Sequence, residues 1–193
     1  CICTNRIFVH QNIEEKFVTR LAEKISALKL GNGMDETSDV GPMINTDAVN
    51  KSESLINDAK SNGATVHAGG TRVDDYFFQP TLLSRLDKSM RIFKEEIFGP
   101  IAAVYTFETE EEAIKLANDT DYGLAAYFYG NNISQIWRVA EALEYGMVGI
   151  NSGLVSSAVS PFGGIKQSGF GSEGSKYGIQ EYLNIKSMVW GGI

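Results

Sequence analysis

The sequence has only two cysteines, Cys1 and Cys3, among its 193 residues. Two cysteines cannot form a disulfide framework, so we expect a reducing compartment, the cytoplasm or the mitochondrial matrix. The two histidines, His10 and His67, stand alone and match no metal-ligand spacing, so no structural metal is expected. No apolar run reaches the roughly 18 residues of a membrane helix, and no signal or transit peptide opens the sequence, so no membrane partner is expected.

The sequence also lacks a basic stripe. Its 17 Lys and Arg residues are interspersed with 24 Asp and Glu residues, which gives a net charge of −7. A protein that binds nucleic acid neutralises phosphates with clustered cations, so no nucleic-acid partner is expected. The hydrophobic fraction of 43% is ordinary, and a chain of this length can bury a core. These values indicate about one globular domain.

Strand patterns and helix patterns alternate along the chain. Residues 101–107 form a continuous apolar run of strand length, which is typical of a strand buried on both faces of a parallel sheet. Further strands are predicted at 6–10, 65–67, 78–83, 124–129 and 146–151, and helices after Asn12, at 47–61, at 110–118 and after Asn132. Three helix starts carry capping pairs, namely Asn12 with Glu15, Thr109 with Glu112 and Asn132 with Gln135. The alternation predicts an α/β fold with a largely parallel sheet flanked by helices.

The C-terminal segment differs from the rest. Residues 181–190 alternate imperfectly and have no following helix to cover them. An uncovered strand edge favours pairing with another chain. We therefore predict a main domain over residues 1–178, an oligomerisation strand at residues 179–193, and a homo-oligomer, either a dimer or a tetramer.

A glycine-rich segment, Gly169-Phe170-Gly171-Ser172-Glu173-Gly174, matches the dinucleotide-binding fingerprint. The fingerprint binds phosphate only between a strand and the N-terminus of a helix. Here the preceding residues have the composition of a loop, and no acidic residue lies on a second strand about 20 residues later. We interpret the segment as an ordinary loop.

The pair Cys1 and Cys3 allows two interpretations. Most free cysteines are small buried hydrophobic residues. A cysteine can instead be a thiolate nucleophile. The spacing alone favours the first interpretation, since it is too close for a thioredoxin-like site and no second pair exists for zinc.

Two longer segments change this balance. They are Lys94-Glu95-Glu96-Ile97-Phe98-Gly99-Pro100 and Pro161-Phe162-Gly163-Gly164-Ile165-Lys166-Gln167-Ser168-Gly169. Both resemble hallmark segments of the aldehyde dehydrogenase superfamily, in family order and with similar separation from a leading cysteine. The resemblance covers nearly the whole chain and implies that residues 1–178 belong to the catalytic domain of that superfamily. Within the superfamily, residues 1–3, 153–157 and 190–192 look most like succinate-semialdehyde dehydrogenases.

The resemblance implies that Cys1 is the catalytic cysteine of an enzyme that oxidises an aldehyde with NAD or NADP. The thiolate adds to the aldehyde carbon, hydride leaves to the nicotinamide ring, and water releases the acid from the remaining thioester. In this family the alkoxide is held by the N–H of the cysteine and by an upstream Asn side chain. The implied substrate is an acidic aldehyde, with succinate semialdehyde preferred.

The resemblance also assigns four binding residues, each with a structural alternative. Glu96 would hold the nicotinamide ribose hydroxyls, or is a solvated acid; Phe98 would pack near the nicotinamide, or is a core aromatic. Ser156 and Phe162 match substrate-pocket positions. A hydroxyl at Ser156 suits a carboxylate tail, although a turn residue would look the same, and Phe162 could be core packing.

Cys3 is a candidate redox partner of Cys1. In an extended chain the two Cα atoms would lie about 6.6–6.8 Å apart, at the edge of the range for a disulfide. We therefore hypothesise that oxidation onto Cys3 switches Cys1 off. One departure from the family pattern is Ser172, where an Arg is common, which puts a local ion pair in doubt.

The resemblance further implies what lies outside this chain. We expect the dinucleotide-binding domain, the general base and the substrate-binding arginines upstream, and we expect residues 1–193 alone to be inactive. Two alternatives remain open: an N-terminal-nucleophile hydrolase that uses Cys1 and its α-amine, and a non-catalytic assembly module. Neither alternative explains the paired hallmark segments.

Overall fold

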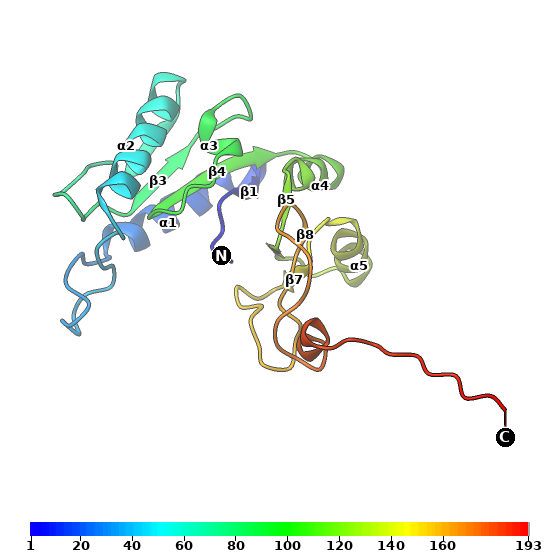
Figure 1. Cartoon of the computed structure of the whole chain (residues 1–193). Helices are drawn as coiled ribbons and strands as arrows, with labels where there is room; N and C mark the ends of the chain where they lie inside the picture. Colours follow the sequence, from blue (N-terminus) through cyan, green and yellow to red (C-terminus); the bar gives the residue numbers. More distant parts are fainter. Residues whose placement is uncertain (193) are drawn as a thin grey trace. The chain divides into compact units, whose positions relative to one another are not determined.

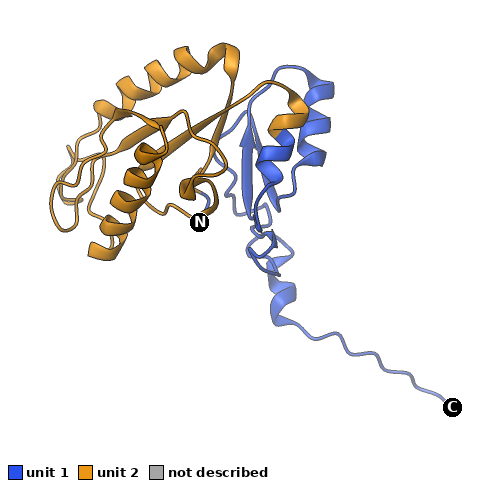
Figure 2. Ribbon diagram, turned by 90° about the horizontal axis from the view of Figure 1, so that it is seen from above, with its two compact units in different colours: residues 1–2, 114–193 blue, residues 3–113 orange. Residues whose placement is uncertain are grey.

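The computed structural model describes residues 1–192, which divide into two compact units (Figure 2). The larger unit is Cys3–Ala113, and the smaller unit comprises Cys1–Ile2 and the chain from Ile114 onward. The boundary falls inside helix α4 (Glu110–Asn118). This boundary separates two densely packed parts of the chain and does not test the domain boundary predicted after residue 178, which stays a prediction.

The larger unit is built on a four-stranded mixed sheet (Figure 1). Its strands are β1 (Ile7–His10), β2 (Thr65–Ala68), β3 (Thr81–Ser84) and β4 (Ile101–Phe107), in the order β1-β4-β3-β2. Strands β1 and β3 both run parallel to β4, while β2 is antiparallel to β3. The apolar run at β4 therefore lies between two strands, as its sequence predicts. The predicted α/β fold with a largely parallel sheet is confirmed.

Helices cover both faces of this sheet. On one face, Val18 of helix α1 (Glu14–Ser26) packs with Val9, Leu82 and Val104, all at most 5% exposed. Burying one such side chain contributes roughly 1.5–3 kcal/mol, so this face alone is a substantial core. On the other face, helix α3 (Arg91–Lys94) packs against β1 and β4, and helix α2 (Thr46–Ser61) packs against α3.

An aromatic cluster joins α3 to the sheet. The Phe93 ring lies 6.4 Å from the Phe8 ring and 5.3 Å from the Tyr105 ring, both edge to face. The Arg6 guanidinium lies 4.9 Å from the Phe93 ring centroid, within range of a cation–π contact. Burial raises the pKa of the Tyr105 hydroxyl far above its ordinary value, so this group stays neutral.

Replacing Tyr105 with Phe is expected to raise the free energy of unfolding by about 1 kcal/mol. The side chain is 3% exposed, and its hydroxyl finds no hydrogen-bond partner among residues 1–192. Desolvating an unpaired hydroxyl costs about 1–3 kcal/mol, and Phe keeps the ring contacts. Urea unfolding of the two proteins measures the difference. A lower unfolding midpoint for Tyr105→Phe would mean that the hydroxyl has a stabilising partner.

The smaller unit contains two strand pairs. Strands β6 (Ala125–Phe128) and β7 (Met147–Ile150) run parallel and are connected through helix α5 (Ile133–Ala142). Strands β5 (Tyr122–Gly123) and β8 (Ile165–Lys166) are antiparallel. Lys166 fixes the second pair, since its Nζ donates to the carbonyls of Asn118 and Thr120 at 3.2 and 3.3 Å and pairs with Glu144.

Two of the three predicted helix caps are confirmed. Asn132 Oδ1 accepts from the N–H of Gln135, and Thr109 Oγ1 accepts from the N–H of Glu112. The predicted cap at Asn12 is wrong. Asn12 lies inside a 3₁₀ turn, η1 (Gln11–Ile13), and His10 Nδ1 accepts its N–H instead. The His10 side chain thus caps η1, and helix α1, which starts at Glu14, has no side-chain cap.

The glycine-rich segment 169–174 lies in a loop, as predicted. The strand before it, β8, has only two residues, and the next helical element is the short 3₁₀ helix η2 (Gly178–Tyr182). No α-helix opens at Gly174, so the segment offers no helix N-terminus to a phosphate.

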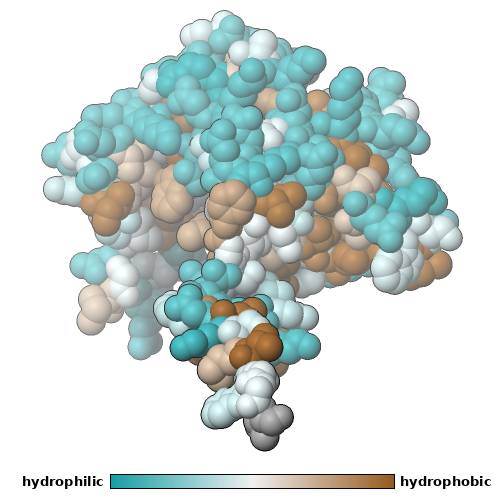
Figure 3. All heavy atoms as spheres, turned by 45° about the vertical axis from the view of Figure 1, so that its right-hand side comes forward, coloured by the Kyte–Doolittle hydropathy of each residue, from teal (hydrophilic) through white to brown (hydrophobic). Residues whose placement is uncertain are grey.

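The C-terminal segment is not a strand in this structure. Residues 178–182 form η2, which contradicts the strand expected from Glu181, and residues 183–192 have no regular structure. Figure 3 shows hydrophobic atoms exposed to solvent along this segment. Ile185 is 103% exposed and Trp190 is 88% exposed. A strand forms only when a neighbouring strand supplies its hydrogen bonds, so pairing with another chain stays a prediction.

Within residues 1–192, no helix is long and apolar enough to span a membrane. The same residues contain no group of three or more His, Cys, Asp or Glu side chains that could hold a metal ion.

Candidate active site

The dipeptide that begins with Cys1 is anchored to the smaller unit. The hydroxyl of Tyr127, in β6, donates to the carbonyl of Ile2 at 2.8 Å. Gly149 lies opposite Tyr127 in β7, and a Cβ there would come within 2.8 Å of the Tyr127 ring. The absence of a side chain at Gly149 therefore leaves room for the ring that holds Ile2. Cys1 itself is an exposed free thiol, and so is Cys3, which belongs to the larger unit.

The segment that carries Glu96 and Phe98 follows helix α3 and is held from two sides. Arg91 Nε and Nη2 donate to the Glu95 carboxylate at 2.7 and 3.1 Å, and Arg91 Nη1 donates to Ser54 Oγ of α2 at 3.0 Å. The hydrogen bonds from Arg91 hold the pKa of Glu95 below its ordinary value, so the ion pair between Arg91 and Glu95 persists in mildly acidic solution.

The second support of this segment is the side chain of Asn5. Its Oδ1 accepts from the N–H of Ile97 at 2.8 Å, and its Nδ2 donates to the carbonyl of Glu95 at 3.3 Å. Ile97 points into the core, at 3% exposed, whereas Glu96 is exposed. The segment thus presents the Glu96 carboxylate outward from a fixed backbone.

Phe98 has a strained backbone. Its φ of +47° lies in the left-handed region, where a bulky residue is a true outlier. The side chain is 68% exposed, which excludes the alternative that Phe98 is a core aromatic. A strained residue that gains nothing from burial is typical of a functional position.

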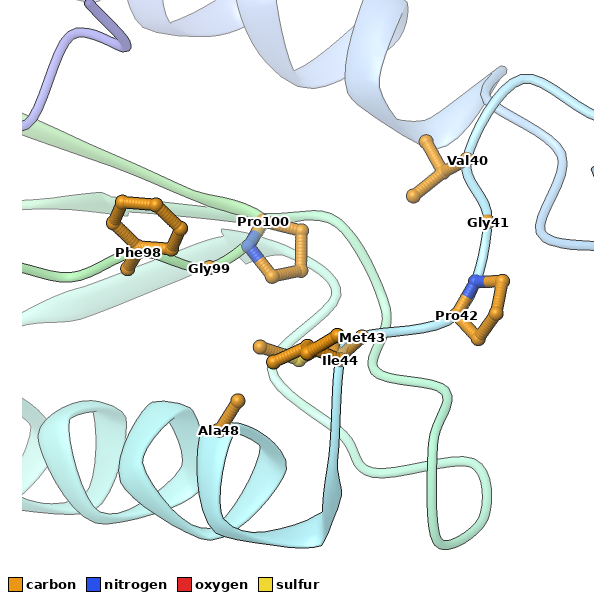
Figure 4. Close-up of a pocket in the computed structure, with 9 residues that line it drawn as sticks. All are labelled: Val40, Gly41, Pro42, Met43, Ile44, Ala48, Phe98, Gly99 and Pro100. Carbon is orange, nitrogen blue, oxygen red and sulfur yellow. The ribbon is translucent and has the colours of Figure 1, made fainter. Parts of the chain in front are cut away.

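The Phe98 ring forms one wall of an apolar pocket of about 260 Å³ (Figure 4). The opposite wall comes from the loop before α2 and from the first turn of that helix. The lining residues are Val40, Gly41, Pro42, Met43, Ile44, Ala48, Phe98, Gly99 and Pro100. No charged side chain lines the pocket, so it suits an apolar, uncharged group.

Replacing Phe98 with Gly or with Ala is expected to give variants that differ in their free energy of unfolding but not in their affinity for cofactor. Glycine adopts positive φ freely, so Phe98→Gly should be about 1 kcal/mol more stable to unfolding than Phe98→Ala, which keeps the strain. Both variants lose the ring that the sequence resemblance assigns to the nicotinamide, so both are expected to bind that cofactor more weakly by a similar factor. Urea unfolding and cofactor titration measure the two effects. Equal stability of the Gly and Ala variants would show that the backbone at residue 98 is not strained.

Ser156 and Phe162 lie in the loop between β7 and β8. Ser156 is exposed and Phe162 is half-buried. The loop is fixed at its start by Asn151, whose side-chain amide exchanges two hydrogen bonds with the backbone of Gly130, both at 2.8 Å. Near its end, the N–H and carbonyl of Phe162 pair with the backbone of Glu173 at 2.9 and 2.7 Å. The loop is therefore tied to the fold at both ends.

The structure brings the predicted residues together in two groups. Glu96 and Phe98 share one segment of the larger unit, beside the pocket, while Cys1, Ser156 and Phe162 belong to the smaller unit. The sequence did not reveal the supporting side chains Asn5, Tyr127 and Asn151, because their partners are backbone groups distant in the sequence. Arg91 was also missed, although its spacing of four residues from Glu95 is a signal for an ion pair on a helix.

The fold and these motif positions define a class of enzyme. The aldehyde dehydrogenase family model matches residues 1–188, and the chain belongs to that family. The family is one of oxidoreductases, and the sequence-based resemblance is confirmed.

Within the family the chain is close to succinate-semialdehyde dehydrogenases. It is 49% identical over 195 residues to the mitochondrial succinate-semialdehyde dehydrogenase of Oryza sativa subsp. japonica, covering 100% of this chain and 37% of the relative. It is 51% identical over 186 residues to the glutarate-semialdehyde dehydrogenase of Pseudomonas putida, covering 96% of this chain and 39% of that protein.

Solved structures of aldehyde dehydrogenases also match the fold of this chain. The crystal structure of succinate-semialdehyde dehydrogenase from Burkholderia pseudomallei matches with a TM-score of 0.93 and 53% identity, over 94% of this chain and 38% of that chain. Betaine aldehyde dehydrogenase from Staphylococcus aureus, in complex with NAD+, matches with a TM-score of 0.88 and 45% identity, over 93% of this chain and 37% of that chain. The chain thus spans between 37% and 39% of the length of these four relatives.

Proposed function

We propose that the protein of which these residues form part oxidises succinate semialdehyde to succinate with NAD or NADP, using Cys1 as the nucleophile. The observation that carries the proposal is the segment of Glu96 and Phe98. It presents an exposed carboxylate next to a strained, exposed aromatic ring at an apolar pocket. Such a combination of polar and apolar groups suits a ribose joined to a flat heteroaromatic ring.

The residues present fit a nicotinamide cofactor. The Glu96 carboxylate can accept two hydrogen bonds from ribose hydroxyls, and the Phe98 ring can cover one face of the nicotinamide. The cofactor supplies the acceptor for the hydride that leaves the aldehyde carbon. Arg91 and Asn5 keep the binding segment rigid, which lowers the conformational entropy lost on binding.

Cys1 carries the covalent chemistry in this proposal. Its thiolate adds to the aldehyde carbon, and the acyl group remains on sulfur as a thioester once the hydride has left. Water then attacks the thioester carbon, releases succinate and returns the thiol. Because Tyr127 holds the carbonyl of Ile2, the chain beside the nucleophile has a fixed position on β6, as an aligned attack requires.

Ser156 gives the preference for an acidic aldehyde. Its hydroxyl is exposed on the anchored loop and can donate a hydrogen bond to a carboxylate. Phe162, half-buried on the same loop, would contact the carbon chain of the substrate. The names of the three semialdehyde dehydrogenase relatives are consistent with a substrate that ends in a carboxylate.

A kinetic comparison with the full-length enzyme tests this function. We expect kcat/KM to be highest for succinate semialdehyde, lower for glutarate semialdehyde, and lowest for an uncharged aldehyde of equal length. Ser156→Ala should raise KM for succinate semialdehyde by up to about tenfold, the effect of one lost hydrogen bond to a charged group. Ser157→Ala is the matched control. Equal kcat/KM for the acidic and the uncharged aldehyde would contradict the proposed substrate.

Peroxide is expected to inactivate the enzyme reversibly by joining Cys1 to Cys3. Both thiols are exposed. Hydrogen peroxide takes two hydrogens from the two thiols, forming one disulfide and two waters. Intact mass should fall by two hydrogens, and dithiothreitol should restore activity. In Cys3→Ser, prolonged exposure to peroxide should carry Cys1 past the sulfenic acid to the sulfinic acid, which dithiothreitol does not reduce. Oxygen adducts on Cys1 without any loss of hydrogen would contradict the switch.

Assembly and location complete the proposal. The exposed apolar segment 183–192 supports pairing with a second copy of the enzyme, because an isolated chain would leave these side chains in water. We place the enzyme in a reducing compartment, the cytoplasm or the mitochondrial matrix, where an exposed thiol such as Cys1 stays reduced.

A further inference from the structure

We infer that Asn5 is a positioning residue that sets the direction of Glu96 for cofactor binding. The inference rests on the proposed function of Glu96 as a cofactor contact. Asn5 lies just before β1 and only four residues after Cys1 in the sequence. The short stretch of chain that begins with the proposed nucleophile would therefore also control the cofactor-binding segment.

The geometry is specific to Glu96. The carbonyl of Glu95 belongs to the peptide group before Glu96, and the N–H of Ile97 belongs to the peptide group after it. Asn5 bonds to both, at 3.3 and 2.8 Å, so one side chain holds the two peptide groups that flank Glu96. The φ and ψ of a residue are the rotations between its two peptide groups, so Asn5 fixes the direction of the Glu96 Cα–Cβ bond.

The ion pair between Arg91 and Glu95 cannot set the direction of Glu96 by itself. Arg91 holds the Glu95 carboxylate but makes no hydrogen bond to either peptide group beside Glu96. Ile97 is 3% exposed, and its N–H would lack a partner if the Asn5 side chain were removed. The segment would then move to find a new partner, and Glu96 would move with it.

The smaller unit offers a matched control. The side-chain amide of Asn118 makes the same kind of double contact, donating to the carbonyl of Ala142 at 2.8 Å and accepting from the N–H of Glu144 at 2.9 Å. Asn118→Ala removes the same chemistry from another part of the fold. It should lower stability without changing cofactor affinity.

The inference is tested by titrating the full-length enzyme with NADH and with NADPH and measuring Kd from the change in nucleotide fluorescence. For the cofactor that binds, Asn5→Ala should raise Kd by about tenfold, whereas Asn118→Ala should leave it unchanged. Asn5→Asp keeps the acceptor for Ile97 but loses the donor to Glu95, so it should fall between wild type and Asn5→Ala. This milder variant also allows the comparison if Asn5→Ala does not fold.

Two further readouts separate positioning from general stability. The variant that combines Asn5→Ala with Glu96→Gln should bind no more weakly than Glu96→Gln alone, because Asn5 acts through Glu96. Alkylation of Cys1 by iodoacetamide without cofactor should proceed at the wild-type rate in Asn5→Ala. A multiplicative loss in the double variant, or an equal loss in Asn118→Ala, would overturn the inference.

The same titration distinguishes a failure of the role inferred for Asn5 from a failure of the role proposed for Glu96. If Glu96→Gln weakens cofactor binding and Asn5→Ala does not, the inference fails and the role of Glu96 stands. If Glu96→Gln leaves Kd unchanged, the assignment of Glu96 fails, and the inference fails with it.

Discussion

Replacing Cys1 with Ser in the full-length enzyme is expected to lower kcat for aldehyde oxidation by about 10⁴-fold or more. A hydroxyl is a far weaker nucleophile than a thiol near neutral pH, because a thiol is already a few per cent thiolate there. Removing the nucleophile of a covalent mechanism typically costs losses of this size. Initial rates of NAD(P)H formation measure the effect.

The control for this prediction is two residues away. Cys3→Ser should retain wild-type activity, since Cys3 has no role in the proposed reaction. Cofactor affinity should be unchanged in both variants, because Glu96 and Phe98 remain. Activity in Cys1→Ser comparable to wild type would refute the nucleophile assignment.

Replacing Gly146 with Ala is expected to lower the free energy of unfolding by about 3 kcal/mol. Gly146 immediately precedes β7, and an added Cβ would overlap the carbonyl oxygen of Gly163 and lie 2.8 Å from its carbonyl carbon. The clash is with backbone, so it cannot be relieved by rotating a side chain, and the segment after Phe162 must move. The midpoint of urea unfolding measures the loss.

Gly153→Ala is the matched substitution in the same unit. A Cβ at Gly153 would meet only the Tyr129 hydroxyl, at an ordinary 3.7 Å. Its effect should stay within about 0.5 kcal/mol. Similar losses in the two variants would mean that the close approach of Gly146 to Gly163 does not control stability.

Local sequence patterns predicted the bounds of those elements that depend only on their own residues. Residues 101–107 were predicted as a buried strand from their apolar run, and β4 has those bounds. The helix at 110–118 was predicted from its capping residues, and α4 has those bounds as well. Such elements depend on short-range hydrophobic patterns and caps, which the sequence displays directly.

The errors arose where the outcome depends on neighbours distant in the sequence. The cap at Asn12 was lost to His10, and the strand from Glu181 requires a partner strand that residues 1–192 do not supply. An alternating pattern shows that a segment can pair, but the partner decides whether it does.

The candidate site was predicted in the same uneven way. The hallmark segment directed attention to Glu96 and Phe98, but no pattern indicated the positive φ of Phe98. The role of Asn5 was equally hidden, because its partner Ile97 lies 92 residues away along the chain. Contacts of that kind are visible only once the sheet has brought β1 beside β4.

The most direct test of the proposed reaction is to trap its covalent intermediate. The full-length enzyme would be mixed with succinate semialdehyde and NAD or NADP, quenched in acid within the first turnover, digested and analysed by mass spectrometry. The account predicts a peptide that carries the mass of a succinyl group on Cys1 and that disappears when turnover is complete. Succinate formation with no acyl group on Cys1, or with the group on Cys3, would contradict it.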